Sequence, residues 1–467
     1  MARERDADRS VRGKQGHQLG PEAKDPTRAV VIVPVLTRQP RSEDDSNRPR
    51  LTRSADARHD EAVGLASAID LNPVHTAVVT VADPRPATLL GSGKVAEFAD
   101  IVKERKAELV IVDHPLTPVQ QRNLEKELNA KVLDRTGLIL EIFGRRARTK
   151  EGTLQVELAH LNYQRSRLVR TWTHLERQRG GFGFLGGPGE SQLETDRRLI
   201  DERIIRIETD LEKVKKRRKL HRDSRAGVPY PIVALVGYTN AGKSTLFNRV
   251  TRASVVAADM LFATLDPTLR SVALPNGLKV ILSDTVGFIS ELPTMLVAAF
   301  RATLEEVIEA NVILHVRDVS HEDTEAQLHD VEEVLRSLGV EPNEEQRLIE
   351  VWNKIDMLDE DGRTRLKNLA ERRPAAQKPV LLSALTGEGI DELSAAIEAR
   401  LSLKRVVLDL SLDPADGAGV SWLHRHTEVM EKALDGEGRY AMKVRVAPDR
   451  VDSVTAKFGE PHKTGLH

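Results

Sequence analysis

The sequence predicts a multidomain α/β protein arranged around a central phosphate-binding domain. The chain has 467 residues, which is too long for a single hydrophobic core. Apolar strands alternate with amphipathic helices near the N-terminus and again after residue 229, a rhythm typical of mostly parallel sheets. Between these regions lie two long helix-compatible stretches joined by a glycine-rich segment, which indicates an antiparallel helical hairpin.

These patterns divide the chain into five expected parts. Residues 1–28 are polar and charged, and we expect them to be disordered. A small α/β domain should occupy residues 29–144, and the helical hairpin residues 145–228. Residues 229–403 should form the phosphate-binding domain, with a mostly parallel sheet and helices on both faces. Residues 404–467 should form a second small α/β domain.

Composition limits the classes of function. Charged residues make up 30 % of the chain but the formal net charge is only −1, so a polyanion would need a local basic patch. The absence of cysteine excludes disulfides, thiolate zinc sites and cysteine nucleophiles. No apolar run reaches the roughly 18 residues that span a bilayer, and the N-terminus lacks a signal-peptide core. We therefore expect a cytoplasmic protein without a membrane span. A monomer is also expected, although the sequence does not determine the oligomeric state.

In the first α/β domain, we expect strands at residues 29–35, 76–81, 109–113 and 131–135, and helices at 61–69, 95–106 and 117–129. The polar stretch at 39–60 reads as a long exposed loop. Gly91-Ser-Gly-Lys94 could be mistaken for a second nucleotide site, but the leading glycine is missing and Val95 stands where a hydroxyl is needed. A turn at a helix start is the better interpretation, and a weak anion site there stays open.

The most informative motif is Gly237-Tyr-Thr-Asn-Ala-Gly-Lys-Ser244, which follows an apolar strand and precedes an amphipathic helix. This is the phosphate-binding P-loop in its strand–loop–helix context. Gly242 lets backbone N–H groups face a phosphate, and Lys243 reaches the β- and γ-phosphates. Ser244 offers a hydroxyl to Mg²⁺. A simple glycine-rich turn would not account for all eight positions and both flanks.

Two further segments supply groups that a nucleoside triphosphate with Mg²⁺ requires. Thr264 could complete the Mg²⁺ coordination when a γ-phosphate is present, with Thr268 as a competing candidate. In Asp284-Thr-Val-Gly287, Asp284 would hold Mg²⁺ through water and the Gly287 N–H would contact the γ-phosphate. We therefore assign catalytic roles to Lys243, Thr264 and Gly287, and Mg²⁺ ligation to Ser244, Thr264 and Asp284.

Asn353-Lys-Ile-Asp356 indicates that the base is guanine. The Asp356 carboxylate can accept hydrogen bonds from N1–H and N2–H of guanine, whereas adenine presents an acceptor at N1. Lys354 would pack over the ring, Asn353 would tie this loop to the P-loop, and the Ser383-Ala384 loop would contact guanine O6 through a backbone N–H. The five motifs together predict a Mg²⁺-dependent GTP hydrolase. The residues expected at the nucleotide are Gly237, Tyr238, Thr239, Asn240, Ala241, Gly242, Lys243, Ser244, Thr245, Phe262, Ala263, Thr264, Leu265, Asp266, Asp284, Thr285, Val286, Gly287, Asn353, Lys354, Ile355, Asp356, Ser383, Ala384 and Leu385.

Phe288 occupies the position where regulatory GTPases carry a glutamine that orients the attacking water. Phenylalanine cannot hydrogen-bond water, so we expect slow intrinsic hydrolysis. A partner, a rearranged switch segment or backbone groups would have to position the water.

The expected hairpin helices, residues 152–177 and 190–222, carry basic clusters at the ends opposite the glycine-rich loop, before the first helix and at the end of the second. An antiparallel arrangement would bring the clusters together and favour RNA, although a charge run is more often a solvated helix face. The glycine-rich loop at residues 180–189 could meet splayed bases or be an ordinary loop. The candidate RNA contacts are Arg145, Arg146, Arg148, Lys150, Lys213, Lys215, Lys216, Arg217, Arg218 and Lys219.

In the C-terminal part, we expect strands at residues 406–410 and 439–446 and helices at 417–434 and 450–458. His424 and His426 lack a third ligand, so surface positions are more plausible for them than a metal site.

Taken together, these motifs resemble the HflX family of translational GTPases, in the Obg–HflX group. Gly187-Pro-Gly-Glu190, Gln192-Leu-Glu194 and Asp196-Arg-Arg198 resemble the family's signature between its two long helices, although Gly186 stands where the family often has arginine. The resemblance implies binding to the large ribosomal subunit and its rRNA in the GTP form. It also implies ribosome-stimulated hydrolysis, and the splitting or rescue of stalled ribosomes under stress, with antibiotic protection as a possible variant.

Two other classes of function remain open from the residues alone. One is an RNA-remodelling protein whose GTPase domain is only regulatory. The other is a signalling GTPase with a protein effector. Co-sedimentation with large subunits in GTP and GDP states distinguishes them from a ribosome-associated switch.

Overall fold

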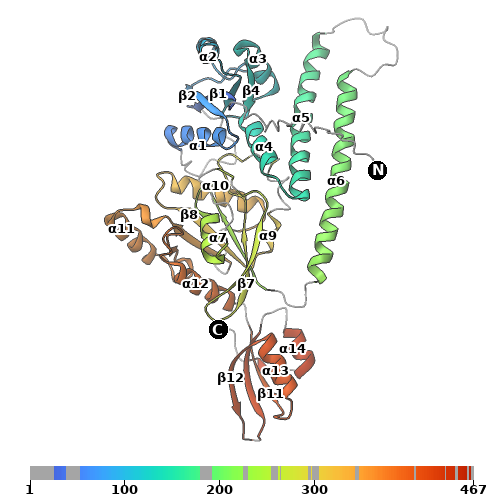
Figure 1. The fold of residues 1–467 in the computed structure, drawn as a ribbon, viewed down its shortest axis with the longest axis vertical. Helices are drawn as coiled ribbons and strands as arrows, with labels where there is room; N and C mark the ends of the chain where they lie inside the picture. Colours follow the sequence, from blue (N-terminus) through green and yellow to red (C-terminus); the bar gives the residue numbers. More distant parts are fainter. Residues whose placement is uncertain are drawn as a thin grey trace, which may run out of the picture.

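The computed structural model describes residues 26–37, 53–178, 192–224, 230–253, 261–262, 264–292, 296, 304–341, 347–403, 406–436, 438–446, 451–459 and 462–463; for 169–178, 192–193, 218–224 and 462–463 it describes the backbone only. These residues form three sheets and a helical hairpin (Figure 1). The N-terminal sheet and the C-terminal sheet lie at opposite ends, with the P-loop domain between them. The expectations for residues 1–25 and for the glycine-rich loop at 180–189 lie outside the described residues.

The N-terminal sheet is parallel throughout, with the order β2-β1-β3-β4. Helices α2 and α3 cover one face, and α1 and α4 lie on the other, toward the P-loop domain (Figure 1). The central strand β1 is fully buried from Ala29 to Val33 because it is an apolar run flanked on both sides. The elements are β1 Arg28–Leu36, α1 Ala55–Ser67, β2 Asn72–Val81, α2 Ser92–Arg105, β3 Leu109–Val112, α3 Pro118–Leu128, β4 Lys131–Asp134 and α4 Arg135–Arg146.

Two predictions for this domain are wrong in part. The predicted loop at 39–60 extends too far, because α1 begins at Ala55 and is capped by Ser54, whose Oγ accepts a hydrogen bond from the Ala57 N–H at 3.0 Å. The early turns of α1 are charged, so its apolar periodicity is weak. Helix α4 has no counterpart among the predicted elements. It follows β4 without a loop, since Asp134 ends the strand and also caps the helix through the Gly137 N–H at 2.8 Å.

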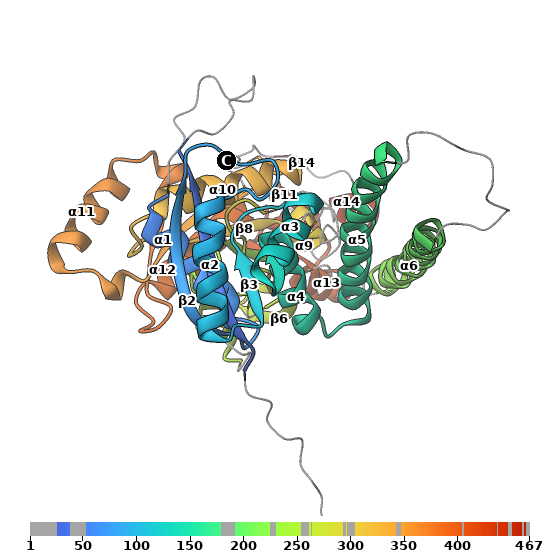
Figure 2. The same ribbon diagram turned by 90° about the horizontal axis from the view of Figure 1, so that it is seen from above.

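The predicted helical hairpin is present. Helix α5 (Lys150–Gln178) lies between α4 and α6 (Gln192–Ser224), as Figure 2 shows. Two ion pairs join the hairpin helices, Glu157–Arg203 at 2.6 Å and Arg165–Asp201 at 3.3 Å. Residues that are later in α5 therefore pair with earlier residues of α6, which makes the two helices antiparallel.

The central domain has the predicted mostly parallel sheet with helices on both faces. Its strand order is β10-β9-β8-β5-β7-β6, and only the β6–β7 pair is antiparallel. One hydrophobic cluster runs without interruption from the N-terminal sheet through α4 to this domain. The elements are β5 Ile232–Gly237, α7 Lys243–Thr251, β6 Thr268–Ala273, β7 Lys279–Asp284, α9 Glu305–Glu309, β8 Val312–Asp318, α10 Thr324–Ser337, β9 Leu348–Asn353, η2 Ile355–Met357, α11 Glu360–Glu371, η3 Ala375–Gln377, β10 Val380–Leu381 and α12 Ile390–Ser402.

The C-terminal sheet is antiparallel, with the order β12-β13-β11-β14. The predicted helix at 417–434 is wrong beyond His426, because Thr427 is extended and the next residues pair with β13 as an edge strand. The polar, helix-favouring residues of this exposed strand explain the error. The elements are β11 Val406–Leu412, α13 Gly417–His426, β12 Glu428–Leu434, β13 Tyr440–Val446, α14 Val451–Phe458 and β14 His462–Lys463.

Within the described ranges, no group of three or more His, Cys, Asp or Glu side chains is placed to hold a metal. His426 instead stacks on Trp422, with ring centroids 4.3 Å apart, and its Nδ1 lies 2.8 Å from the Trp422 carbonyl oxygen. In the part of the chain that the structure describes, no helix is both long and apolar enough to cross a membrane.

Buried His315 on β8 should make the protein sensitive to acid. Burial lowers its pKa to about 4, although Glu350 opposes this effect. The unfolded chain therefore takes up a proton below about pH 6.5 that the folded chain takes up only below about pH 4. We expect the free energy of unfolding to fall across this window by on the order of 3 kcal/mol. Urea unfolding of His315→Leu should show a flatter pH dependence, and an unchanged slope would contradict this assignment.

Candidate nucleotide-binding site

The P-loop backbone needs glycine at two described positions. Gly237 ends β5 with φ +150°, and a Cβ there would lie 2.2 Å from the Val316 carbonyl oxygen. Gly242 precedes α7 with φ +90°, and a Cβ there would meet the Asn353 side chain. The loop therefore curls tightly over the carboxyl end of the sheet and leads into a helix N-terminus, where N–H groups and the helix dipole favour an anion.

Lys243 lies buried inside this loop. Its Nζ donates to the carbonyl oxygens of Gly237 at 3.1 Å and Tyr238 at 2.7 Å. Burial lowers its pKa to about 8, and Asp284 counteracts that shift. A Cβ on Gly287 would lie 3.0 Å from Nζ, so the Asp-x-x-Gly segment passes directly beside the ammonium group. A phosphate placed here would meet a desolvated cation and nearby backbone.

Three side-chain oxygens converge next to Lys243. Ser244 Oγ lies 2.7 Å from Asp284 Oδ2, Thr264 Oγ1 lies 3.1 Å from the same oxygen, and the two hydroxyl oxygens are 3.0 Å apart. Burial raises the pKa of Asp284, and its Oδ1 is buried without a hydrogen-bond partner. Hard oxygens and an unsatisfied buried carboxylate fit Mg²⁺. Thr268, the competing candidate, is the first residue of β6.

Asn353 joins the predicted base-recognition loop to the P-loop. Its buried side chain donates to the Ala241 carbonyl at 2.8 Å and accepts from the Ala384 N–H at 2.9 Å. Lys354, with φ +66°, pairs with Asp318 at 2.7 Å. Asp356 follows within η2. Asn353 thus joins its own loop to the P-loop and to the loop after β10, at the end of the sheet where the P-loop lies.

The loop after β10 uses several backbone N–H groups in protein contacts. The Ala384 N–H donates to Asn353, and the Ser383 N–H donates to the Glu388 carbonyl at 2.9 Å. The Thr386 N–H donates to the Ser383 side chain, also within the loop. Leu385, between these residues, has an exposed side chain.

Several residues of the segment before β6 also make contacts outside the P-loop domain. Asp266 turns toward the start of α5, where its carboxylate accepts hydrogen bonds from the Arg148 and Thr149 N–H groups, both at 2.9 Å. Phe262 packs edge-on against Phe143 of α4 at 4.8 Å, and Leu265 is also buried. Thr264 alone of the described residues 262 and 264–266 joins the oxygen cluster. Ala263 lies outside the described residues.

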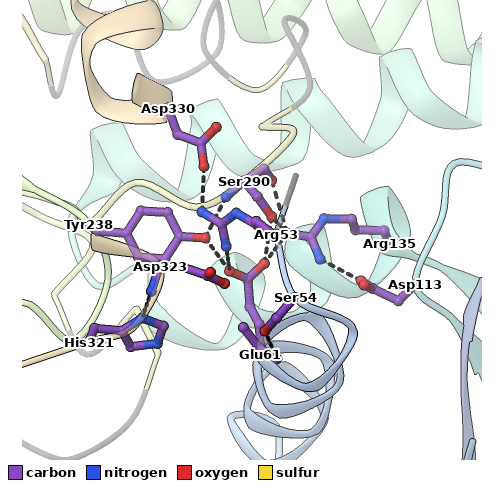
Figure 3. A network of polar contacts seen from close by, with 11 residues as sticks. Arg53, Ser54, Glu61, Asp113, Arg135, Tyr238, Ser290, His321, Asp323 and Asp330 are labelled. Carbon is purple, nitrogen blue, oxygen red and sulfur yellow. Dashed lines mark hydrogen bonds and ion pairs between the residues drawn. The ribbon is translucent and has the colours of Figure 1, made fainter. Parts of the chain in front are cut away.

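A buried polar network that no sequence motif predicts joins the N-terminal domain to the P-loop (Figure 3). The Tyr238 hydroxyl donates to Glu61 of α1 and accepts from the Ser290 N–H at 2.7 Å. Arg135 pairs with Glu61 and Asp113, and Arg53 pairs with Glu61 and Asp330. Burial alone would raise the pKa of Glu61, but the two arginines hold it at about 2.

Within this network, the Tyr238 side chain contacts Glu61 and Arg53 of the N-terminal region. Its phenol is buried and keeps its proton, because burial and then Glu61 raise its pKa well above the usual value. Arg53 lies over the ring, with the guanidinium carbon 4.8 Å from the ring centroid. Arg53 lies in the polar stretch at 39–60, whose composition predicts an exposed loop, so its sequence carries no signal for this network.

The predicted basic patch is only partly assembled. Lys213 bonds Asp210 at 2.9 Å and lowers its pKa, and Lys150 acts more weakly on the same carboxylate, so the start of α5 lies near the basic stretch of α6. Arg145 and Arg146, however, donate to carbonyl oxygens at the end of α1, at 2.6 and 3.2 Å. Lys216 and Arg217 are exposed. The side chains of Arg218 and Lys219 lie outside the described residues.

The P-loop, the converging Ser244, Thr264 and Asp284 oxygens and the Asn353 loop, at one end of a mostly parallel sheet, define a P-loop GTPase. Family models match four consecutive stretches: "GTP-binding GTPase N-terminal" at residues 56–144, "GTP-binding GTPase Middle Region" at 146–225, "50S ribosome-binding GTPase" at 232–354 and "HflX C-terminal domain" at 368–465.

Similar proteins agree with these matches. A protein named GTPase HflX from Magnetococcus marinus is 49 % identical over 401 residues, which cover 86 % of this chain and 90 % of that protein. GTPase HflX from Escherichia coli is 48 % identical over 363 residues, or 78 % of this chain and 83 % of that protein. The chain belongs to the HflX family of GTPases and is a GTP hydrolase, which confirms the resemblance seen in its motifs.

Among solved structures, a GTP-binding protein from the archaeon Sulfolobus solfataricus in complex with GDP is 23 % identical. The alignment covers 80 % of this chain and 98 % of that chain, with a TM-score of 0.41.

Replacing Asp356 with asparagine tests the base assignment. The asparagine N–H would face the N2–H of guanine, so GTP affinity should fall at least about 100-fold. Xanthine carries a carbonyl at C2, so xanthosine triphosphate should bind better to this variant than to the unchanged protein. Asp361→Asn, at an exposed position on nearby α11, is the matched control. Equal GTP affinity of Asp356→Asn and the control in a calorimetric titration would contradict the assignment.

Proposed function

We propose that this GTPase binds the large ribosomal subunit in its GTP form and dissociates or rescues stalled ribosomes under stress, in the cytoplasm. The observation that carries the proposal is the match of residues 232–354 to a family of 50S ribosome-binding GTPases. Protection against an antibiotic that stalls ribosomes would be one outcome of such rescue.

Mg²⁺ would be held by Ser244 and Thr264, with Asp284 acting through water, and would neutralise charge on the β- and γ-phosphates. The Lys243 ammonium would bind the same phosphates, and Gly287 would offer its N–H to the γ-phosphate. Thr264 is the group expected to distinguish GTP from GDP, because its hydroxyl has a second role only when a γ-phosphate completes the metal coordination. The nucleotide state would then control the conformation of the segment around Thr264.

In the described part of the site, we identify no side chain that would position the attacking water. Phe288 is buried, and its backbone pairs with the P-loop strand: its N–H donates to Gly237 at 3.1 Å and its carbonyl accepts from Thr239 at 2.7 Å. The ring therefore belongs to the core, and its rotation toward the nucleotide would break packing. This supports slow intrinsic hydrolysis and stimulation by the ribosome.

The hairpin supports contact with rRNA. Helix α6 lies on the outer side of α5, away from the sheets (Figure 2), and exposed Lys216 and Arg217 lie beyond the Lys213–Asp210 pair on α6. Cations at such positions bind a phosphate backbone without reading sequence. An RNA-remodelling role would use the same surface, but it would not require preference for GTP.

Co-sedimentation with purified large subunits tests the proposal. We expect binding with Mg²⁺ and a non-hydrolysable GTP analogue to exceed binding with GDP at least tenfold, because the two nucleotides stabilise different switch conformations. Equal binding in both states would exclude the switch. Binding to naked RNA that equals binding to subunits would favour RNA remodelling.

Neutralising cations of α6 locates the RNA surface. The triple change Lys213→Ala, Lys216→Ala and Arg217→Ala should weaken subunit binding and reduce its salt dependence, since each lost phosphate contact lowers the slope by about one unit. A control triple on α11, Arg365→Ala, Lys367→Ala and Arg372→Ala, removes three exposed cations without touching the hairpin. Equal salt slopes for the two triples would contradict this location.

Changing Phe288 to glutamine should not create a faster enzyme. The amide would be buried among apolar side chains, so we expect a loss of unfolding free energy of about 3 kcal/mol. Single-turnover GTP hydrolysis without ribosomes should not accelerate. A stable, faster Phe288→Gln protein would show that the side chain at this position reaches the nucleotide.

A further inference from the structure

We propose that helix α4 couples two nucleotide-sensing segments to the helical hairpin. One segment contains Thr264 and Asp266, and Asp266 bonds the link that follows the carboxyl end of the helix. The other contains Gly287 and Ser290, and Ser290 bonds the first residue of the helix. Such coupling goes beyond the proposed ribosomal function, because it requires nucleotide binding but no ribosome. The expected result is a hairpin whose orientation depends on whether GTP or GDP is bound.

At the carboxyl end of α4, Asp266 acts as a cap for the hairpin. Its carboxylate accepts hydrogen bonds from the backbone N–H groups of Arg148 and Thr149 at 2.9 Å each, and from the Thr149 hydroxyl at 2.6 Å. These groups lie just before and at the start of α5, where a helix dipole favours negative charge. Three contacts to one carboxylate fix both the position and the direction of the helix start.

Gly152 shows how closely Asp266 fits. A Cβ on this glycine would lie 2.4 Å from Asp266 Oδ1, inside any permitted contact. Glycine within the first turn of a helix lowers helix stability by up to about 1 kcal/mol relative to alanine. The absence of a side chain is thus explained by the approach of Asp266, and the position provides a way to break the contact without changing a polar group.

Asp266 cannot move independently of the nucleotide site. It follows Thr264 by two residues, a reach of at most about 7 Å in extended chain, and Thr264 lies in the oxygen cluster with Ser244 and Asp284. On the other side of Thr264, Phe262 packs against Phe143 of α4. The segment is therefore attached to α4 and α5 on both sides of the threonine that is expected to respond to the γ-phosphate.

At its first residue, α4 holds the other nucleotide-sensing segment. The Arg135 guanidinium, 3 % exposed, donates to the Ser290 carbonyl at 2.9 Å and to the Ser290 hydroxyl at 2.8 Å (Figure 3). Ser290 follows Gly287 by three residues, and its N–H donates to the Tyr238 hydroxyl. Ion pairs with Glu61 and Asp113 fix the guanidinium from the side of the N-terminal domain.

The helix between these contacts transmits movement because it is rigid. It has 12 residues, or about 18 Å, and its buried face includes Leu138, Ile142 and Phe143. After a three-residue link it continues into α5, whose 29 residues span about 43 Å. Each degree of tilt at the base of α5 would shift its far end by roughly 0.75 Å. A small change at either segment therefore becomes a large displacement of the hairpin tip.

Because the protein has no cysteine, fluorescent dyes attach only at cysteines that are introduced for the test. Cysteines introduced at Glu194, near the tip of α6, and Lys367, on α11, are both exposed and accept a pair of fluorescent dyes. Energy transfer is measured with saturating GDP and with a non-hydrolysable GTP analogue plus Mg²⁺, without ribosomes. A fluorescent nucleotide verifies saturation for every variant. We expect a reproducible difference in transfer efficiency between the two states.

Three variants separate coupling from folding. Asp266→Ala and Gly152→Ala should both abolish at least half of the nucleotide-dependent difference, although Gly152→Ala raises helix propensity. Gly144→Ala is the matched control, because an added Cβ there meets no atom within 4 Å and lies in α4 itself. It should keep the full difference.

Other outcomes would overturn the proposal. One is a full difference in Gly152→Ala and Asp266→Ala, and another is the absence of any nucleotide-dependent difference in the labelled parent. Failure of Asp266→Ala to bind nucleotide at saturating concentration would make Asp266 a binding residue and not a coupling residue. Because ribosomes are absent, none of these results depends on the proposed ribosomal role.

Discussion

The buried carboxylate of Asp284 is the group on which the nucleotide site depends. It lies at the end of β7 with one oxygen shared by the Ser244 and Thr264 hydroxyls and the other without a partner. An isolated buried carboxylate is unfavourable, and here burial raises its pKa. A cation in this position removes the penalty. The sheet, the P-loop and the segment before β6 therefore converge on one electrostatic requirement, which the bound nucleotide and Mg²⁺ would meet.

The same segments also satisfy groups of the N-terminal region and the hairpin. Asp266 supplies the acceptor for unpaired N–H groups at the start of α5, while Ser290 and Tyr238 share polar contacts with Arg135 and Glu61. Removing one partner from such a buried set would leave the others uncompensated, which is more damaging than the loss of a surface pair. Hydrogen bonds and ion pairs therefore connect the nucleotide site to elements that precede it in the chain by about a hundred residues.

The features that could be predicted are those whose sequence signal lies within one continuous stretch of the chain. Gly237, Lys243 and Asp284 lie at fixed spacings within single strand–loop units, so motif and context were enough to predict that they lie close together, as the structure has them. The helical hairpin was also predictable, because its apolar periodicity runs for many turns.

The sequence is least informative where tertiary contacts decide. Asp266 fits a nucleotide motif by position, and nothing in its sequence indicates that its carboxylate also contacts the start of α5, more than a hundred residues earlier. Arg53 looked solvated because its partners Glu61 and Asp330 lie on different domains. Strand β12 contains helix-favouring residues, and only pairing with β13 makes it a strand.

Amide hydrogen exchange at the junction of α4 and α5 tests the central claim most directly. The Thr264 segment should change its conformation with the bound nucleotide, and Asp266 should transmit that change to the hairpin. With a non-hydrolysable GTP analogue and Mg²⁺, the Arg148 and Thr149 amides should exchange slowly, because both donate to Asp266. With GDP they should exchange at least tenfold faster, while amides of β5 stay protected. Identical exchange at these two amides in both nucleotide states would contradict the account.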